Sequence, residues 1–237
     1  MSQPQRGLLG GSGSIWAEKG LHRPRFESPC FLDPLTSGED AAALEAFLEA
    51  TPLEIEIGCG RGHFIEEMAR THPTRRFLVI EARGRYIRMA LRRLDRLGAQ
   101  NVRVVYGDAR ELLPALVGEG AAQAIYLLFP DPWWKKRHVR KRVATPEFLE
   151  TIRSRLSPGG VLVFRSDVED YVNRMDGLIA ELEGYEGTDG IPEGTARSHR
   201  HKKCLALGAP VWERGYVAKK EVGEVVVSHG DEEGGTE

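Results

Sequence analysis

A Pro-Asp-Pro turn carries the first residue whose setting suggests chemistry. Asp131 lies in the stretch FPDPWWKKRHVRKRV (residues 129–143), after an apolar run and before two tryptophans and six Lys or Arg side chains. A carboxylate can accept hydrogen bonds from the Watson-Crick edge of guanine or stabilise a cationic ring, and neighbouring cations can bind phosphates. A charge run is also common on a solvated helix face. The motif alone therefore leaves both interpretations open.

Further acids and glycines lie where other short apolar runs end. Glycine lets the backbone approach a ligand where a Cβ would collide, and an acid about 20 residues after such a turn can reach a ribose diol. The glycines of the turn EIGCGRGHF are Gly58, Gly60 and Gly62, and the acids are Glu56, Glu81 and Asp108, the last followed by Ala109. An acid at a strand end is otherwise often only a helix cap.

The glycine turn favours one nucleoside cofactor over another. A dinucleotide fingerprint needs a third glycine where this chain has His63, which counts against NAD. S-adenosyl-L-methionine instead presents an ammonium group, ribose hydroxyls and an adenine amino group, which are positive or donate hydrogen bonds. Glu56, Glu81 and Asp108 suit these three groups, so we expect S-adenosyl-L-methionine as the cofactor.

The elements that must position these residues alternate along the chain. Short runs rich in branched and aromatic residues predict strands, and the segments between them have apolar residues at helical spacing. Strands are predicted at 53–58, 76–82, 101–109, 124–132 and 161–167, with closing strands near 210–217 and 221–227. This alternation predicts an α/β, Rossmann-like fold with a mainly parallel seven-stranded sheet and helices on both faces.

Composition bounds the organisation of the chain. The 237 residues carry a net charge of -2 and three widely spaced cysteines, which indicates one ordinary domain in a reducing compartment. We expect a flexible N-terminal arm (1–35), one domain (36–227) and an acidic disordered tail (228–237). No segment resembles a signal peptide or a membrane span, so we expect a cytoplasmic protein without membrane contact.

Together these stretches resemble a known family. EIGCGRGHF, FLVIEARGRYI, GDARELL, FPDPWWKKRHVRKRV and FLETIRSRLSPGGVLVFRSDVEDYV are similar to the bacterial tRNA (guanine-N(7)-)-methyltransferases, from residue 53 to about 175. The resemblance implies a class I S-adenosylmethionine-dependent methyltransferase fold and methyl transfer to N(7) of a guanosine in the tRNA variable loop. It places Glu56, Glu81, Asp108 and Asp131 at the cofactor, with Asp131 also at the reaction centre, and it places Lys135 and Asp167 on the substrate.

Two segments extend or depart from this pattern. Lys136 and Arg137 continue the basic run after Lys135, so we expect them to bind flanking phosphates. Near the C-terminus the family has a Thr-x-Phe/Tyr-Glu element that closes over the substrate, whereas this chain has GTARSHRHKKC. If Ser198 is the equivalent hydroxyl and a substrate-binding residue, His201 occupies the place of the acid, which puts the contact made through this element in doubt.

Several alternatives remain open at this point. An exocyclic-amine nucleic-acid methyltransferase is favoured faintly by Asp131-Pro132-Trp133, and a noncatalytic RNA-binding module with the same fold is favoured by the altered C-terminal element. An NAD-linked oxidoreductase is a more distant alternative. His199, His201 and Cys204 also invite a zinc interpretation, but no fourth ligand is evident unless the N-terminal arm with His22 or Cys30 folds over, and we expect no metal. The expected partner is tRNA, and the chain is expected to be a monomer or a homodimer.

Overall fold

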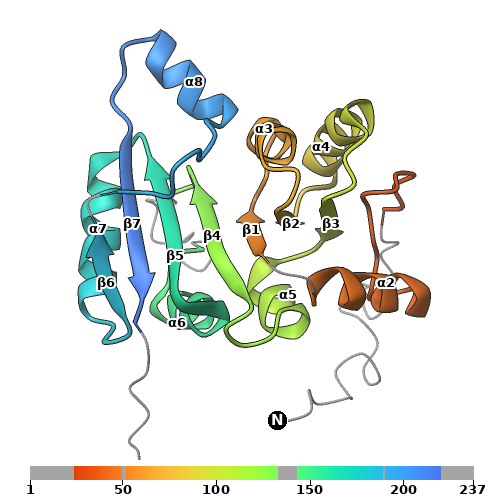
Figure 1. The fold of residues 1–237 in the computed structure, drawn as a ribbon. Helices are drawn as coiled ribbons and strands as arrows, with labels where there is room; N and C mark the ends of the chain where they lie inside the picture. Colours follow the sequence, from red (N-terminus) through yellow and green to blue (C-terminus); the bar gives the residue numbers. More distant parts are fainter. Residues whose placement is uncertain (1–23, 50–51, 133–142, 189, 220–237) are drawn as a thin grey trace, which may run out of the picture.

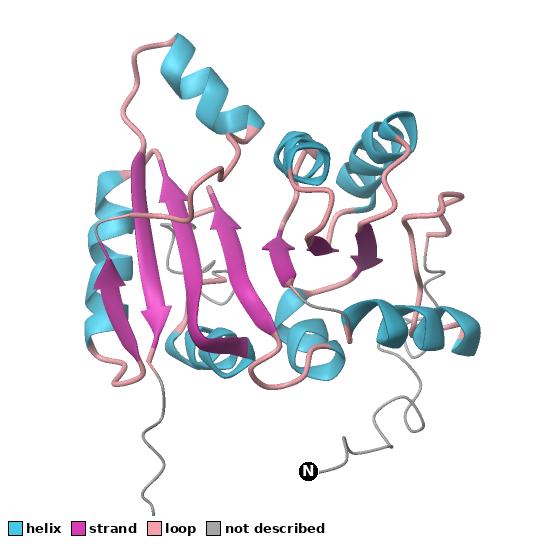
Figure 2. Cartoon of the chain, viewed as in Figure 1, coloured by secondary structure: helices cyan, strands magenta, loops and turns pink. Residues whose placement is uncertain are grey.

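The fold is an α/β sandwich built on one sheet (Figures 1 and 2). The computed structural model describes residues 24–49, 52–132, 143–188 and 190–219. The strands are β1 (Leu53–Ile57), β2 (Arg76–Glu81), β3 (Val102–Tyr106), β4 (Ala122–Leu128), β5 (Leu156–Ser166), β6 (Tyr185–Thr188) and β7 (Trp212–Ala218). The helices are α2 (Gly38–Leu48), α3 (His63–Thr71), α4 (Gly84–Leu97), α5 (Ala109–Leu116), α6 (Pro146–Arg155), α7 (Glu169–Ala180) and α8 (His199–Ala206).

The strand order confirms the predicted fold class. The sheet has seven strands in the order β3-β2-β1-β4-β5-β7-β6. The pairs among β1 to β5 are parallel, whereas β7 runs antiparallel to both β5 and β6. The strand predicted near 210–217 is β7, the one predicted at 221–227 lies outside the described residues, and β6 was not predicted at all.

The strand order reverses between β1 and β4. From β1 the chain builds outward through β2 to β3 on one side, and β4 and β5 are added on the other. Loops that leave adjacent parallel strands toward opposite faces diverge, and this opens a crevice at the carboxyl edge of the sheet. A ligand site is therefore expected above the ends of β1 and β4.

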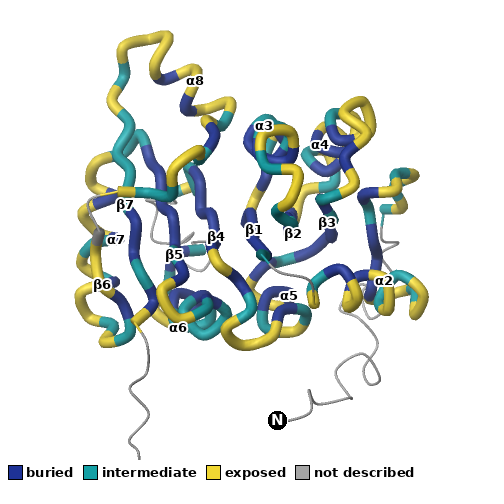
Figure 3. The backbone as a smooth tube through the Cα atoms, in the orientation of Figure 1, coloured by how far each residue is buried: buried dark blue, intermediate teal, exposed yellow. Residues whose placement is uncertain are grey.

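The core has one cluster of buried residues on each face of the sheet. Along β2, Phe77 and Val79 pack with residues of α3 and α4, while Leu78 and Ile80 pack with residues of α5 and α6. Successive side chains of a strand point to opposite faces, and parallel strands covered on both faces are apolar throughout. Figure 3 shows the central strands buried along most of their length, with exposed residues concentrated on the helices and loops.

The segment before α2 packs along the outer edge of the sheet. Leu32 N donates to Val104 O at 3.1 Å and Val104 N donates to Cys30 O at 2.8 Å, and Phe31 forms an isolated parallel bridge with Val104. Cys30 is 1% exposed. Residues 24–35 thus contact the domain, unlike the flexible arm expected there, whereas 1–23 and the acidic tail lie outside the described residues.

Helix α8 is carried at the carboxyl edge of the sheet by the connection between β6 and β7 (Figure 1). Ala196, just before this helix, is held from two directions: its N–H lies 3.4 Å from Met68 Sδ of α3, and its carbonyl accepts a hydrogen bond from Arg165 of β5. Arg165 is buried and also pairs with Glu213 of β7 at 3.0 Å. These contacts position α8 beside the crevice. No helix in the described part of the chain is long and apolar enough to cross a membrane.

Candidate functional site

A pocket of about 640 Å³ lies at the carboxyl edge of the sheet. Its walls come from the ends of β1, β2 and β4, the turn after β3, and the start of α8. The predicted residues that line it are Glu56, Gly58, Gly60, Glu81, Asp108, Ala109, Asp131, Asp167 and Ser198. Residues separated by more than a hundred positions in the sequence thus meet at the place where the strand order reverses.

The glycine turn serves both the pocket and the helix packing. Gly58 and Gly60 line the pocket with φ of 79° and 51°, and a Cβ on either would point into open space. Gly62, which does not line the pocket, has φ of 76°, and a Cβ there would lie 2.6 Å from Ala90 Cα of α4. The sequence predicts that all three glycines admit a ligand, whereas in the structure Gly62 allows α3 to approach α4 closely.

Glu81 links the end of β2 to the glycine turn. Its carboxylate accepts hydrogen bonds from Arg83 N at 2.8 Å and from Gly60 N at 3.2 Å. Burial raises the pKa of Glu81, and the hydrogen bonds from the backbone of Arg83 and Gly60 partly offset that effect. The carboxylate is thereby oriented at the pocket wall, where it can accept hydrogen bonds from a ribose diol.

Glu56 is a buried carboxyl with an unused oxygen. It is 3% exposed, and its Oε2 has no hydrogen-bond partner among the described residues. Burial, with the nearby charge of Glu81 as the second cause, raises the pKa of Glu56 to about 8. A buried polar atom without a partner is costly, so a cationic or donating group at this place would be stabilised. The methionine ammonium of S-adenosylmethionine fits that requirement.

Asp108 already has strong partners in this structure. It caps α5 by accepting from Arg110 N at 3.0 Å, and Arg110 Nε lies 3.0 and 3.1 Å from its two carboxylate oxygens. Desolvation alone would raise the pKa of Asp108, but the hydrogen bonds from Arg110 outweigh it and the pKa is lowered. Asp108 therefore stays an acceptor, as an adenine amino group requires, while neighbouring Ala109 begins α5 at the pocket wall.

Asp131 follows a strained turn at the end of β4. Phe129 has φ of 51°, a region that bulky residues rarely adopt, and it is the only such non-glycine residue in the described part of the chain. Its N–H donates to Arg165 O at 2.7 Å, which ties the turn to β5. Beyond the turn, Asp131 Oδ2 lies 3.0 Å from Arg83 Nη2, with both side chains about half exposed. The strained turn thus directs the carboxylate over the pocket.

The two predicted substrate residues outside the basic run are both engaged by α8. Asp167 accepts a hydrogen bond from Arg200 Nε at 2.9 Å and lies 3.8 Å from Cys204 Sγ. Ser198 caps α8, because its Oγ accepts from His201 N at 3.3 Å. Both residues line the pocket, so the structure is compatible with substrate contact at either one.

His201 does not line the pocket. It is 5% exposed, and its Nε2 lies 3.9 Å from Glu213 Oε1. The side chain in the place of the family's acid is therefore directed toward β7. Among the described residues, no group of three His, Cys, Asp or Glu side chains is arranged to hold a metal ion.

The remaining predictions and some unpredicted residues complete the site. Lys135, Lys136 and Arg137, with Trp133 and Trp134, lie outside the described residues. The pocket residues that were not predicted to contact cofactor or substrate are Arg83, Phe129, Arg200, His63 and His199, among others. Each of these residues contacts a partner far away in the sequence, as Arg200 contacts Asp167. The local spacing of residues therefore could not indicate that it lines the pocket.

Comparisons with known proteins agree with this geometry. A family model described as "Putative methyltransferase" matches residues 50–213. A tRNA (guanine-N(7)-)-methyltransferase of Syntrophotalea carbinolica is 37% identical over 197 residues, which cover 80% of this chain and 84% of that protein. The enzyme of the same name from Myxococcus xanthus is 37% identical over 169 residues, or 68% of this chain and 81% of that protein.

Solved structures agree on the fold. The 16S rRNA methyltransferase KamB has a TM-score of 0.54 at 16% identity, covering 78% of this chain and 94% of that one. The tRNA (m1A58) methyltransferase TrmI from Aquifex aeolicus has a TM-score of 0.50 at 16% identity, covering 83% and 73%. These likenesses confirm the Rossmann-like methyltransferase fold, and the sequence relatives go further: the chain belongs to the tRNA (guanine-N(7)-)-methyltransferase family.

Proposed function

We propose that this chain transfers a methyl group from S-adenosylmethionine to N(7) of a guanosine in the variable loop of tRNA. The observation that carries the proposal is the convergence of four acids, Glu56, Glu81, Asp108 and Asp131, on one pocket at the point where the strand order reverses. The relatives with 37% identity are named for this activity. The cytoplasmic location and the monomeric or homodimeric state stay predictions from the sequence.

Three of these acids have the chemistry to hold the cofactor. Glu56 offers a buried, unused oxygen to the ammonium group, Glu81 offers an oriented carboxylate to the ribose hydroxyls, and Asp108 offers an ionised acceptor to the adenine amino group. Gly58 and Gly60 leave the space beside these acids open. When bound, S-adenosylmethionine supplies an electrophilic methyl group on a sulfonium.

Asp131 is the proposed catalytic residue. Guanine N(7) has an in-plane lone pair and needs no base to remove a proton, so the protein must mainly align the reactants and exclude water. The Asp131 carboxylate can accept hydrogen bonds from the guanine Watson-Crick edge and balance the positive charge that the ring acquires. In this structure Oδ2 of that carboxylate lies 3.0 Å from Arg83 Nη2, so a base that binds Asp131 competes with Arg83 for this oxygen.

The test is transfer of labelled methyl from S-adenosylmethionine to bulk unmodified tRNA, followed by identification of the product nucleoside by mass spectrometry. The expected product is 7-methylguanosine in the variable loop. A methylated exocyclic amine of adenine or cytosine would favour the alternative methyltransferase class. Tight tRNA binding with no methylated product would favour a noncatalytic RNA-binding module and overturn the proposal.

A further inference from the structure

Two histidine rings form the contact between α3 and α8 at the pocket. His63, the first residue of α3, stacks on His199, the first residue of α8, with ring centroids 4.7 Å apart and an angle of 26° between the planes. Both rings line the pocket that Asp131 also lines. A stacked pair of rings at this place has no evident role in holding the cofactor.

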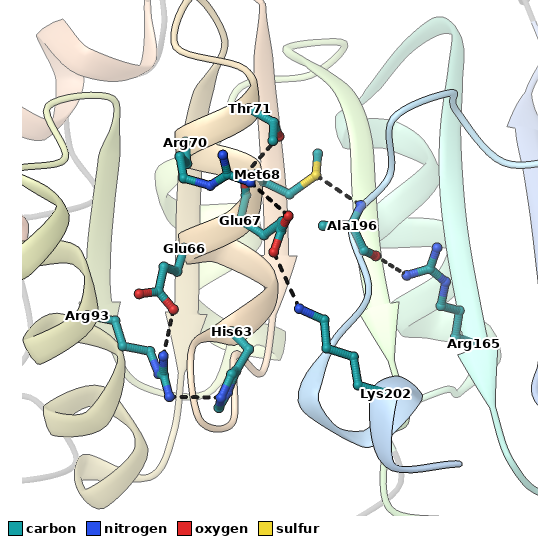
Figure 4. A network of polar contacts seen from close by, with 10 residues as sticks. All are labelled: His63, Glu66, Glu67, Met68, Arg70, Thr71, Arg93, Arg165, Ala196 and Lys202. Atoms are coloured by element: carbon teal, nitrogen blue, oxygen red, sulfur yellow. Dashed lines mark hydrogen bonds and ion pairs between the residues drawn. The ribbon is translucent and has the colours of Figure 1, made fainter. Parts of the chain in front are cut away.

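The hydrogen bonds of His63 determine its protonation state. Arg93 Nη2 lies 2.8 Å from His63 Nε2, and a guanidinium can only donate, so this nitrogen of the ring must be the acceptor (Figure 4). Protonation of His63 would break that hydrogen bond. Burial, with Arg93 as the next cause, lowers the pKa of His63. His63 is therefore a neutral ring against which His199 packs.

His199 lies in a field of cations. Burial lowers its pKa, followed by the positive charges of Arg61 on the glycine turn, Arg93 of α4 and Lys203 of α8. No carboxylate is among the described groups that shift it. The backbone at the start of α8 adds partial positive charge on the same side, because the first N–H groups of a helix have no partner within it.

The two carboxylates on the first turn of α3 after His63 are already paired with cations. Glu66 accepts from Arg93 at 2.6 Å, while Glu67 is shared by Arg70 at 3.0 Å and Lys202 at 3.3 Å (Figure 4). By contrast, the exposed side chains of Arg61 and Lys203 form no ion pair within the described segments. Arg61 and Lys203 thus carry positive charge that no carboxylate among the described residues neutralises.

We infer that Arg61, His199 and Lys203 form a binding site for a backbone phosphate of the RNA, at the rim of the pocket into which the target base enters. The inference rests on the proposed function, since a base held near Asp131 brings its own backbone to the pocket rim. The site takes a singly charged phosphodiester oxygen and reads no sequence. Arg61 belongs to the glycine turn before α3, and His199 and Lys203 belong to α8. None of the three is part of the basic run at 135–142 in the sequence.

Phosphate binding at this place is linked to proton binding. In the free chain His199 is neutral near pH 7, because burial first and the surrounding cations second lower its pKa. A phosphate reverses that field and raises the pKa of His199, so RNA binding takes up a proton and strengthens as the pH falls. The charged groups that face His199 are Arg61, Arg93 and Lys203, and neutral His63 covers one side of its ring.

The test is the affinity of the full chain for an unmodified tRNA transcript, measured by fluorescence anisotropy between pH 5.5 and 8 and over a series of salt concentrations. For the wild-type chain we expect affinity to rise roughly three- to tenfold from pH 7.5 to 5.5. His199→Gln should remove most of this rise. Replacing Arg61 and Lys203 together by Gln should weaken the salt dependence of binding. The negative slope of log affinity against log salt should become shallower by roughly one at every pH.

Rescue and control variants separate charge from fold. His199→Lys keeps a cation at this place, so it should restore the affinity seen at low pH but abolish its pH dependence. His72→Gln alters another histidine with a lowered pKa, at the far end of α3, and Arg174→Gln removes an exposed cation on α7. Both controls should leave the pH profile and the salt slope unchanged. Thermal unfolding identifies any variant that fails to fold. If the His199 variants fail to fold, the double variant of the exposed Arg61 and Lys203 still tests the phosphate site.

The outcomes distinguish the two proposals. If the wild-type chain forms 7-methylguanosine while the His199 and Arg61/Lys203 variants keep the wild-type pH profile and salt slope, the phosphate site is wrong and the proposed function stands. If the wild-type chain neither binds nor methylates tRNA, both proposals are overturned. If the control variants weaken the salt dependence of tRNA affinity as much as the Arg61/Lys203 variant does, the effect is due to net charge. That result would overturn the phosphate site and leave the proposed function standing.

Discussion

Arg83 Nη2 and Asp131 Oδ2 lie 3.0 Å apart at the pocket, so the proposed catalytic carboxylate is paired before any substrate arrives. Both side chains are about half exposed, and such pairs contribute at most about 1 kcal/mol to stability. The pair therefore matters more for access to Asp131 than for the fold. A guanine that needs this carboxylate competes with Arg83 for it.

Replacing Arg83 by Gln should lower the KM for tRNA a few-fold, because the substrate no longer displaces a cation from Asp131. The melting temperature should change little. Steady-state kinetics at fixed, saturating cofactor would measure the effect. A higher KM would mean that Arg83 binds the substrate itself.

Replacing Asp131 by Ala should abolish turnover while the affinity for S-adenosylhomocysteine falls much less. The expectation follows from the place of this residue after β4, where its half-exposed carboxylate is proposed to contact the base rather than the buried part of the cofactor. Single-turnover methyl transfer and calorimetric binding would separate the two effects. Wild-type rates in this variant would refute the catalytic role.

Glu56 should make cofactor binding depend on pH. With a pKa of about 8 in the free chain, this carboxyl is mostly protonated at pH 7, and a bound ammonium group favours its ionised form. Affinity for S-adenosylhomocysteine should therefore rise by up to roughly tenfold between pH 6.5 and 8.5, with proton release. Calorimetry in buffers of different ionisation enthalpy would measure both, and Glu56→Gln should bind weakly with a flat profile.

The same carboxyl affects the stability of the free chain, and the sign is opposite to that of an ordinary paired acid. Between about pH 4.5 and 8 the folded state keeps a proton that the unfolded state has lost. The free energy of unfolding therefore decreases as the pH rises through this range, on the order of a few kcal/mol in total. Glu56→Gln should flatten this decrease in denaturant titrations, and an unchanged slope would contradict the raised pKa.

Gly62→Ala should destabilise the fold by about 2–4 kcal/mol, from the strain at positive φ and from overpacking. The added Cβ would lie 2.6 Å from Ala90 Cα, so α3 and α4 would have to separate. Gly60→Ala is the matched control, because Gly60 also has a positive φ but faces open space. This variant should lose less stability than Gly62→Ala, and its cofactor affinity should fall more. Equal unfolding costs for the two variants would contradict the packing role of Gly62.

The strand-end acids were predictable for a physical reason. Parallel strands end at one edge of the sheet, so Glu56, Glu81 and Asp108 had to meet once their strands were identified from runs of branched residues. Ion pairs and ring stacks formed by tertiary contacts were not predictable. The pairing of Arg83 with Asp131 and the stacking of His63 on His199 depend on how loops from different βα units converge.

Two other features were hidden for different reasons. Strand β6, with the sequence YEGT, is too short to show an alternating pattern, and it forms because β7 offers it a partner. His201 was expected at the place of a substrate-facing acid, yet it is directed toward Glu213. The direction of a helix side chain depends on how the helix lies on its neighbours, and the sequence of α8 alone does not determine that.

The bridge between Phe31 and Val104 has a consequence for how copies of this chain meet. An outermost strand with unpaired backbone groups invites another chain to add a strand, which is a common start of aggregation. Here the hydrogen bonds of Cys30 and Leu32 occupy Val104 on β3, and the opposite border of the sheet is the four-residue β6. Both edges of the sheet are thereby protected against pairing with a strand of another chain. Removal of residues 24–35 would expose the unpaired backbone groups of Val104 on β3 and favour aggregation.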